Sequence, residues 1–357
     1  MTDCFRGRGA AQNPANRFDR IVLEKDPQWD DTQDPSPKTE FFADDSQSIL
    51  TRNDSPDVGF SCGINPYRGC EHGCIYCYAR PNHEYFGLSS GLDFETKIFV
   101  KMKAPELLRR EFSSPKWKPQ VVALSGITDC YQPVERRLQL TRRCLEVLLE
   151  FRNPVSIITK NRLVTRDIDI LKELARYQAV CVFVSVTTID CHLSGRMEPR
   201  ASRPLDRLCA VEQLAKAGIP VGVLVAPVIP ALTDHEIPSI IFESAKRGAQ
   251  WASYTILRLP FAVKELFEDW LYRHFPERRK KILSRIRSLR AGKLNDPNFH
   301  SRMRGHGPFA EQIENLFRVS CQKAKMNLKN PVLSTASFQK PPSAQLTFCF
   351  DGCLKNS

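Results

Sequence analysis

Three cysteines lie close together in the segment RGCEHGCIYCYARP, residues 68–81. Cys70, Cys74 and Cys77 have the spacing C-x3-C-x2-C, so one short loop carries all three thiols. Thiolates are soft ligands that favour zinc or iron–sulfur clusters. Structural zinc normally takes four ligands, whereas three thiolates suit a 4Fe-4S cube in which one corner stays free. The spacing therefore favours a 4Fe-4S cluster held by these three cysteines.

A zinc site is the alternative for the same three thiols. His72 and His83 are close enough in the sequence to supply a fourth ligand, which would complete a zinc knuckle. The two alternatives differ in the fourth metal-binding position. Zinc would bind a histidine, and the cube would leave one iron without a protein ligand.

The chain has the composition of a protein whose thiols stay reduced. Its 357 residues begin with a polar segment that lacks the apolar stretch of a signal peptide. No run approaches the roughly 20 apolar residues that span a bilayer, so we expect a cytoplasmic protein without a membrane partner. The 13 cysteines then indicate metal ligands, catalytic groups or small buried residues, and not a disulfide framework. The net charge of +12 permits an anionic partner such as DNA or RNA.

The elements that must position the cysteine loop alternate along the chain from about residue 59. Short apolar runs indicate buried strands, and segments with helical periodicity follow them. Strands are expected near 58–64 and within 119–126, 154–160, 179–188, 219–230 and 251–260. Helices are expected at 137–151, 166–177, 203–218 and 234–248.

This alternation predicts an α/β fold with a parallel sheet that is buried on both faces. About six strand–helix units are present, which is fewer than the eight of a full barrel. A partial (β/α)6 barrel of the TIM type and a doubly wound sheet both fit this count, and we predict the partial barrel. In either fold, functional residues are expected at the C-terminal ends of the strands.

The barrel is flanked by regions of different composition. Residues 24–48 are acidic and rich in Pro, Asp and Ser, which is typical of loop or partly disordered chain. Segment 273–293 carries nine Lys or Arg and one Glu, which suits either contact with phosphates or a solvated helix face. The predicted regions are an N-terminal extension 1–57, the barrel 58–260, a basic helical region 261–330 and an extended tail 331–357.

The cysteine loop and the strands behind it resemble the radical S-adenosylmethionine (radical SAM) superfamily. The motif C-x3-C-x-aromatic-C follows the first strand of the repeat, and the partial barrel extends over about residues 58–260. Within the superfamily, the chain is most similar to uncharacterised bacterial proteins related to spore photoproduct lyase. The matching segments are NPYRGCEHGCIYCYARP, TDCYQPVE (128–135), ITK (158–160), VSVTT (184–188) and EPRA (198–201).

The resemblance implies an enzyme that uses a 4Fe-4S cluster and S-adenosylmethionine. In the superfamily, the amino and carboxylate groups of S-adenosylmethionine chelate the free iron, and one electron from the cluster cleaves the C–S bond. The products are methionine and a 5′-deoxyadenosyl radical, which removes hydrogen from the substrate. The electron would come from an external donor of the flavodoxin or ferredoxin type. The protein itself would mainly position the reactants and exclude water.

The resemblance also implies contacts between S-adenosylmethionine and individual side chains. Tyr76 would pack near the adenine, Lys160 would reach the carboxylate, and Ser185 would contact the ribose. Lys160 could instead be a solvated charge at a strand end. Ser185 could be a hydroxyl that is satisfied within the core.

The loop SGITD is implied to bind the amino group of S-adenosylmethionine through Ser125, Gly126, Thr128 and Asp129. Asp129 could instead only cap the following turn. In the lyase, a cysteine in this loop donates hydrogen to the product radical. Gly126 occupies that position here, and the nearest thiol is Cys130, which we expect not to act. The resemblance in the cysteine motif therefore does not imply that this chain repairs thymine dimers.

Other residues remain open to two interpretations. Arg196, Glu198 and Arg200 follow the fourth predicted strand and could form ion pairs or contact the substrate. Cys349 and Cys353 could pair with each other or bind a second metal. Residues 344–350, AQLTFCF, loosely resemble the peptide by which bacterial repair proteins bind the sliding clamp.

Two functions follow from these observations. The first is a radical SAM enzyme with an unidentified substrate, for which nucleic acid is the leading candidate. The second is a cluster- or zinc-bearing protein that binds nucleic acid without radical chemistry. A free corner on the cluster favours the enzyme, because a structural metal site is normally closed.

Overall fold

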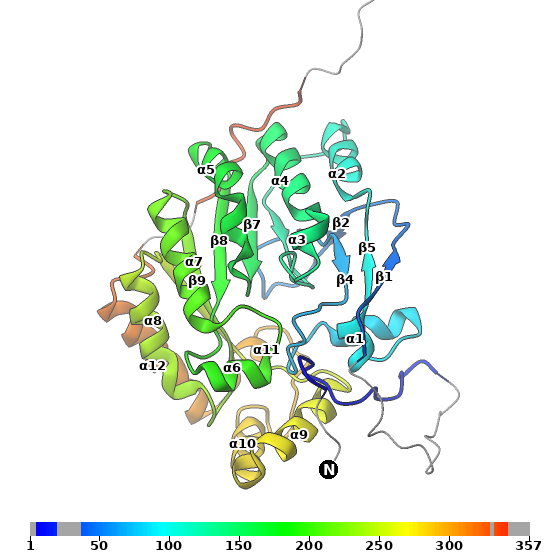
Figure 1. The fold of residues 1–357 in the computed structure, drawn as a ribbon. Coiled ribbons are helices and arrows are strands. Elements are labelled where there is room, and N and C mark those ends of the chain that lie inside the picture. Colours follow the sequence, from blue (N-terminus) through cyan, green and yellow to red (C-terminus); the bar gives the residue numbers. More distant parts are fainter. Residues whose placement is uncertain (1–4, 20–36, 329–331, 342–357) are drawn as a thin grey trace, which may run out of the picture.

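The computed structural model describes residues 5–19, 37–328 and 332–341. Its main sheet contains six parallel strands and one antiparallel edge strand (Figure 1). The strand order is β10-β9-β8-β7-β6-β3-β2. The strands are β2 (Leu50–Arg52), β3 (Cys62–Ile64), β6 (Val122–Leu124), β7 (Val155–Thr159), β8 (Val180–Ser185), β9 (Val221–Val228) and β10 (Trp251–Ile256).

The strand order distinguishes between the two predicted folds. In a doubly wound sheet, the strand order reverses at a switch point. Here β3, β6, β7, β8, β9 and β10 each pair in parallel with the next strand of the series, so the sheet runs in one direction. The partial (β/α)6 barrel is therefore confirmed, and the C-terminal ends of its strands meet at one edge.

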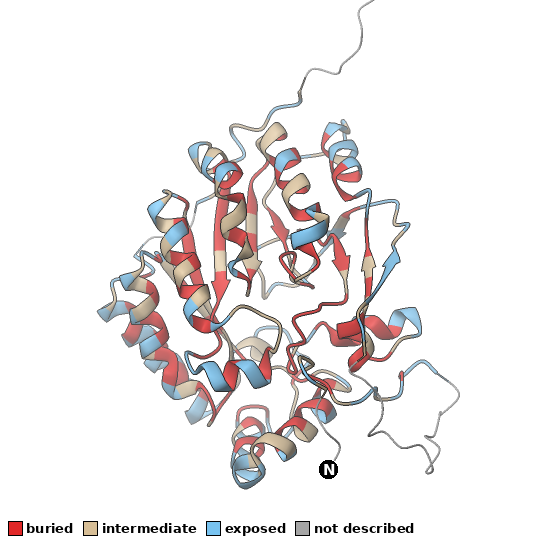
Figure 2. Cartoon of the chain, viewed as in Figure 1, coloured by how far each residue is buried: buried red, intermediate tan, exposed pale blue. Residues whose placement is uncertain are grey.

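Amphipathic helices cover the outer face of this sheet. Figure 2 shows their buried sides turned toward the strands and their exposed sides turned outward. In α5, for example, Ile170, Leu171 and Leu174 are the buried positions, at helical spacing. The covering helices are α2 (Ala104–Ser113), α4 (Leu140–Phe151), α5 (Ile168–Arg176), α7 (Pro204–Lys216), α8 (Ile237–Lys246) and α12 (Pro308–Lys323).

One predicted helix is divided in two. The segment 137–151 forms the short α3 (Glu135–Leu138) and the longer α4, with Gln139 between them. Gln139 has a φ of 52°, in the left-handed region that interrupts a right-handed helix. Residues 166–177 and 234–248 each begin with a 3-10 turn before the α-helix starts.

A second, smaller sheet lies beside the barrel. It contains β1 (Glu40–Ala43), β5 (Lys97–Val100) and β4 (Tyr67–Arg68), in the order β1-β5-β4. The short helix α1 (Leu92–Thr96) precedes β5. Strands β1 and β2 both come from the predicted N-terminal extension, so part of that extension pairs with the two sheets. A domain boundary at residue 57 stays a prediction.

The chain beyond the barrel is helical, as the sequence predicts. Its helices are α9 (Val263–His274), α10 (Pro276–Ser288), α11 (Ser301–Arg304) and α12, and α6 (Cys191–Met197) lies on the same side as α9 and α10 (Figure 1). Pro276 separates α9 from α10, because proline is favoured at the first position of a helix and not in its interior. Among the described residues, no helix is both long and apolar enough to cross a membrane.

Candidate metal and cofactor site

The three cysteines lie on the loop that follows β3 and β4, at the C-terminal end of the first parallel strand. The backbone N–H of Cys70 donates to the carbonyl of Phe94 (2.9 Å), and that of Cys77 donates to the carbonyl of Cys74 (3.2 Å). Cys70 and Cys74 are buried, and Cys77 is partly exposed. Gly73 has a φ of 66°, which lets the loop turn sharply between the first two cysteines.

The donor set fits a 4Fe-4S cube better than a single zinc ion. Among the described residues, no three His, Cys, Asp or Glu side chains converge on a point that could hold one metal ion. A cube needs the thiolates around one cluster but not on one metal ion, because each thiolate binds a different iron. Both candidate histidines have other partners, since His83 Nε2 lies 2.8 Å from the carbonyl of Lys97 and His72 contacts Asp129 and Asn161.

Apolar side chains pack against the thiols, although charged side chains lie at longer range. Cys74 packs in a cluster with Leu92, and Cys70 packs with Phe94. Burial raises the pKa of the Cys70, Cys74 and Cys77 thiols, so all three are neutral without a metal. A bound iron would ionise them. Exclusion of water around the sulfurs is one of the features that set the potential of a cluster.

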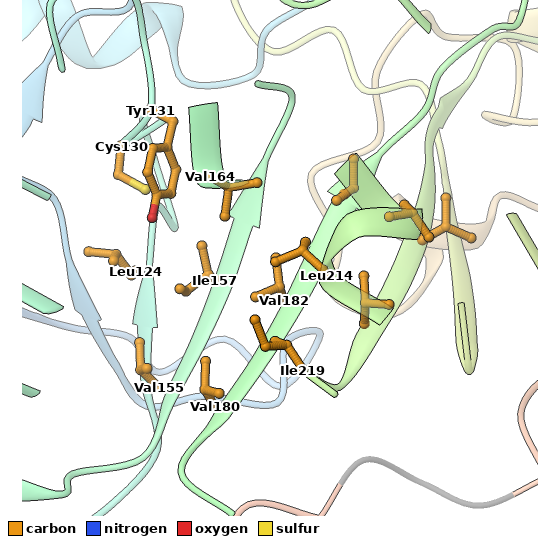
Figure 3. Close-up of a cluster of buried hydrophobic side chains, with 14 of the residues drawn as sticks. Leu124, Cys130, Tyr131, Val155, Ile157, Val164, Val180, Val182, Leu214 and Ile219 are labelled. Atoms are coloured by element: carbon orange, nitrogen blue, oxygen red, sulfur yellow. The ribbon is translucent and has the colours of Figure 1, made fainter. Parts of the chain in front are cut away.

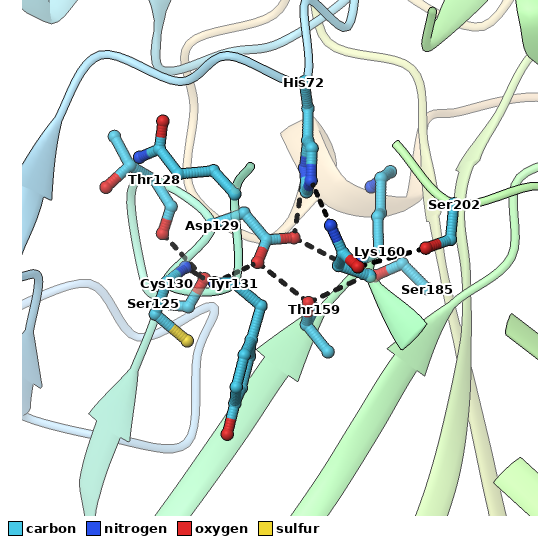
Figure 4. A network of polar contacts seen from close by, with 12 residues as sticks. His72, Ser125, Thr128, Asp129, Cys130, Tyr131, Thr159, Lys160, Ser185 and Ser202 are labelled. Carbon is cyan, nitrogen blue, oxygen red and sulfur yellow. Dashed lines mark hydrogen bonds and ion pairs between the residues drawn. The ribbon is translucent and has the colours of Figure 1, made fainter. Parts of the chain in front are cut away.

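Asp129 connects the cysteine loop to the ends of β6 and β7 (Figure 4). Its carboxylate accepts hydrogen bonds from the backbone N–H of Lys160 (2.7 Å) and the hydroxyl of Thr159 (2.8 Å), and His72 Nδ1 lies 3.4 Å away. Burial alone would raise the pKa of Asp129, but His72 and the N–H groups of Lys160 and Tyr131 lower it to about 2. The aspartate therefore holds three elements together as an anion.

The rest of the SGITD loop is held by hydrogen bonds. The Ser125 hydroxyl donates to the carbonyl of Thr128 (2.7 Å), and Ser125 itself has a φ of 81°. The Gly126 carbonyl accepts from the hydroxyl of Tyr78 (2.7 Å), the residue that follows Cys77. The structure thus brings this loop against the cysteine loop at the strand ends.

Lys160 extends over the cysteine loop from the end of β7. Its ammonium lies 5.8 Å from the centre of the Tyr76 ring and 3.4 Å from the carbonyl of Ala226. In the described part of the chain, it forms no ion pair within 4 Å. Ser185 is buried at the end of β8, the neighbouring strand. Tyr76, Lys160 and Ser185 therefore come from three elements that meet at one edge of the barrel.

Tyr76 is held by a buried ion pair in which Arg207, the partner of Glu198, was not indicated by the sequence. Glu198 pairs with Arg207, and both side chains are almost fully buried. The same carboxylate accepts hydrogen bonds from the hydroxyls of Tyr76 and Thr187. Burial alone would raise the pKa of Glu198, but Arg207 and Lys160 lower it to about 2. Glu198 thus remains an anion that orients the phenol ring.

The three charged residues after β8 have different environments. Glu198 is in the buried pair, and Arg200 lies 3.1 Å from Glu71 on the cysteine loop. Glu198 and Arg200 therefore form ion pairs, which is one of the two alternatives predicted for them. Arg196 forms no ion pair within 4 Å among the described residues and instead lines a pocket with Arg278.

The Cys130 side chain packs in the hydrophobic core, while its backbone N–H donates to the Ser125 hydroxyl of the SGITD loop (3.2 Å). Figure 3 shows its side chain among Leu124, Ile157 and Tyr131. The thiol is fully buried, and burial raises its pKa far above the ordinary range. This location favours the expectation that Cys130 does not donate hydrogen to a substrate.

An N-terminal segment, residues 5–19, packs on the cysteine loop, a contact that we did not predict from the sequence. The backbone N–H groups of Gly9 and Ala10 both donate to the carboxylate of Glu95 (2.9 Å each), which also pairs with the buried Arg80. A Cβ at Gly9 would lie only 1.8 Å from the carbonyl oxygen of Gly73, so glycine alone fits here. The glycines of RGRGA, residues 6–10, were the sequence feature that could have indicated this close contact.

The predicted features of the tail lie outside the described residues. These are segment 344–350, which resembles a peptide that binds the sliding clamp, and the pair Cys349 and Cys353. The last described part of the chain, residues 332–341, lies along the barrel, where the N–H of Gln339 donates to the carbonyl of Phe151 (3.0 Å).

Comparison with known sequences places this geometry among related proteins. The family model of the Radical SAM superfamily matches residues 64–243. The chain is 36% identical over 248 residues to the uncharacterized protein Rv2578c of Mycobacterium tuberculosis, covering 69% of this chain and 72% of the relative. It is 24% identical over 230 residues to a radical SAM Nalpha-GlyT isomerase of Pseudomonas phage M6, covering 64% of this chain and 46% of the isomerase.

Solved structures show the same fold. Spore photoproduct lyase, complexed with a dinucleoside spore photoproduct, matches with a TM-score of 0.58 at 15% sequence identity. The match covers 79% of this chain and 79% of the lyase. At that identity, the likeness is one of fold.

Proposed function

Because this chain belongs to the radical SAM superfamily, we propose that Cys70, Cys74 and Cys77 hold a 4Fe-4S cluster that serves an enzymatic reaction. When bound, the cluster supplies one electron to S-adenosylmethionine, which gives methionine and a 5′-deoxyadenosyl radical that removes hydrogen from a substrate. The observation that supports this proposal is the placement of three thiols on one loop among polar strand ends. A closed zinc site would need a fourth ligand, and both nearby histidines have other partners.

The polar strand ends are suited to bind and orient S-adenosylmethionine. In the part of the chain that the structure describes, the Lys160 ammonium forms no ion pair within 4 Å, although Glu198 acts on it at longer range, and a carboxylate group of the ligand would pair with it. The Tyr76 ring beside it offers a flat face against which an adenine can pack. The loop residues Ser125, Gly126, Thr128 and Asp129 and the buried Ser185 complete the proposed site. Asp129 acts within it by fixing the loop, since its carboxylate already has partners.

A direct test measures cleavage of S-adenosylmethionine. The protein is reconstituted with iron and sulfide without oxygen, then mixed with dithionite and S-adenosylmethionine. We expect 5′-deoxyadenosine and methionine to form in equal amounts. A fully loaded cluster that yields neither product would favour the non-catalytic alternative. Uptake of zinc in place of iron would overturn the ligand assignment.

Nucleic acid is the substrate class that we propose. The net charge of +12 and the basic helix α10 suit a polyanion. Lys280 and Lys281 are exposed on α10, whereas Arg290, just beyond it, is buried and donates to the carbonyls of Ile256 and Leu257. The solved lyase holds a dinucleoside. For this chain, the same class of ligand is a proposal.

Charge reversal on α10 tests the nucleic-acid proposal. We expect Lys280→Glu with Lys281→Glu to weaken DNA or RNA binding and to lower the salt slope by about two, because each phosphate contact contributes roughly 0.9 to that slope. Fluorescence anisotropy at several salt concentrations measures both quantities. Lys172→Glu with Lys323→Glu is the charge-matched control, on the exposed faces of α5 and α12. Unchanged affinity in the α10 variant would mean that α10 is only a solvated surface.

A further inference from the structure

A pocket of about 280 Å³ opens beside the cysteine loop. Gly69 and Ala79 line it, one residue before Cys70 and two residues after Cys77. The pocket therefore reaches the backbone that carries the first and third cysteines. It lies between that loop, the SGITD loop and the small sheet, so it is separate from the position of Lys160 at the end of β7.

Lys101 gives this pocket a cation without a close partner. The side chain follows β5, is only 6% exposed and lines the pocket. Its ammonium has no hydrogen bond and no ion pair within 4 Å in the described part of the chain. Burial lowers the pKa of Lys101 and nearby Arg68 lowers it further, while Asp44 opposes both effects. A buried cation that faces a cavity is suited to an anion from outside.

Aromatic side chains form the rim of the pocket. Tyr85 is 67% exposed and Phe86 is 40% exposed, which is unusual for rings of this size. The guanidinium of Arg68 lies 4.9 Å from the centre of the Phe86 ring, and Phe86 packs against Phe99 of the small sheet. The rim is thus an exposed apolar surface with positive charge inside it, a composition typical of an interaction site.

We propose that this pocket and its rim bind the acidic one-electron carrier that reduces the cluster. The inference rests on the proposed function, because it concerns the electron which that reaction consumes. One electron leaves the reduced flavin or iron–sulfur centre of the carrier and enters the cluster, so the carrier is oxidised by one electron and the cluster is reduced by one. No proton or bond changes partner in this step.

Two properties of the surface match such a carrier. Its position is next to the cysteine backbone, and electron transfer requires a short path. Its charge inside the rim is positive, which complements an acidic partner and speeds association.

The same surface is less suited to nucleic acid. A nucleic acid strand is bound by a row of cations that each neutralise a phosphate. Here Arg68 already pairs with Asp44 at 2.6 Å, and Arg17, near Tyr85, pairs with Glu84 at 2.8 Å. Among the described residues, Lys101 lines the pocket without an ion pair within 4 Å, and Asp44 acts on it only at longer range, which fits a single acidic contact in a partner protein.

The test compares two reductants on the same reconstituted protein. Reduced flavodoxin is the protein probe, dithionite is the small-molecule probe, and stopped-flow absorbance follows reduction of the cluster. We expect Lys101→Gln and Tyr85→Ser each to slow reduction by flavodoxin about tenfold at low salt, while reduction by dithionite keeps its rate. Tyr272→Ser is the control, because Tyr272 is similarly exposed on α9.

Each outcome decides the proposal. An unchanged flavodoxin rate in both variants would overturn it, and so would an equal loss with dithionite, which would place these residues in the cluster site. Loss of DNA binding at an unchanged flavodoxin rate would assign the surface to nucleic acid. A cluster that is reduced normally but yields no 5′-deoxyadenosine would refute the proposed function and leave this proposal standing. A protein that takes up no cluster would overturn both.

Discussion

Cys74→Ala is expected to abolish assembly of the cluster and, with it, all formation of 5′-deoxyadenosine. The remaining two thiols can hold at most two irons, and a cube with two unprotected corners is lost to solvent. Cys74 is also buried against Leu92, so no water-exposed group can replace it as a ligand. Iron and sulfide analysis after anaerobic reconstitution measures the effect directly. The same loss is expected for Cys70→Ala and Cys77→Ala.

The matched control for this prediction is Cys191→Ala. Cys191 is an exposed cysteine at the start of α6, and its removal should leave the iron content at the value of the unsubstituted protein. Full iron content in any one of the three loop variants would refute the assignment of that cysteine.

Arg207→Met is expected to lower the free energy of unfolding by about 3–5 kcal/mol, because it leaves the buried Glu198 without its cation. Methionine keeps most of the side-chain volume, so the loss reports charge more than packing. The control is Arg162→Met, which breaks the exposed pair with Asp206 and should cost about 1 kcal/mol or less. Urea denaturation of the apoprotein measures both variants.

The contribution of Glu198 to the pH dependence of the free energy of unfolding should also have the opposite sign in Arg207→Met and in the unsubstituted protein. In the unsubstituted protein, the pKa of Glu198 is about 2, below its ordinary value. Its contribution is therefore present above the ordinary pKa and is lost as the pH falls toward 2. Without Arg207, burial would raise that pKa, so the variant should lose further stability as the pH rises. Parallel stability curves for the two proteins between about pH 4 and pH 7, offset but with the same slope, would contradict this account.

The barrel was predictable because its signals are local. Each parallel strand is a short apolar run rich in Val and Ile, such as VCVFVS in β8, and each covering helix has apolar residues at helical spacing. The cysteine loop was also predictable, since one motif contains all three thiols. Lys160 and Ser185 were named because of the family resemblance, and both lie at the C-terminal ends of neighbouring strands.

The contacts that hold the site residues in place were not predictable from the sequence, because they join residues that are distant in it. Glu198 was noticed as a charge, but nothing local marked Arg207 in an amphipathic helix as its buried partner. His72 looked like a zinc ligand beside the cysteines, and its contact with Asp129 depends on how two loops meet. The pairing of Gly9 with Glu95 spans 86 residues. Such contacts are set by tertiary packing, for which the sequence offers no periodicity.

The contact between the N-terminal segment and the cysteine loop has a consequence for biogenesis. Gly9 leaves the ribosome before Gly73 and Glu95, so the segment has no binding partner until α1 has been synthesised. During that interval, the nascent cysteine loop lacks this cover. The backbone contact between Gly9 and Gly73 leaves no room for a side chain, so a protein that delivers a preassembled cluster from this side must reach the thiols before the segment binds or must displace it.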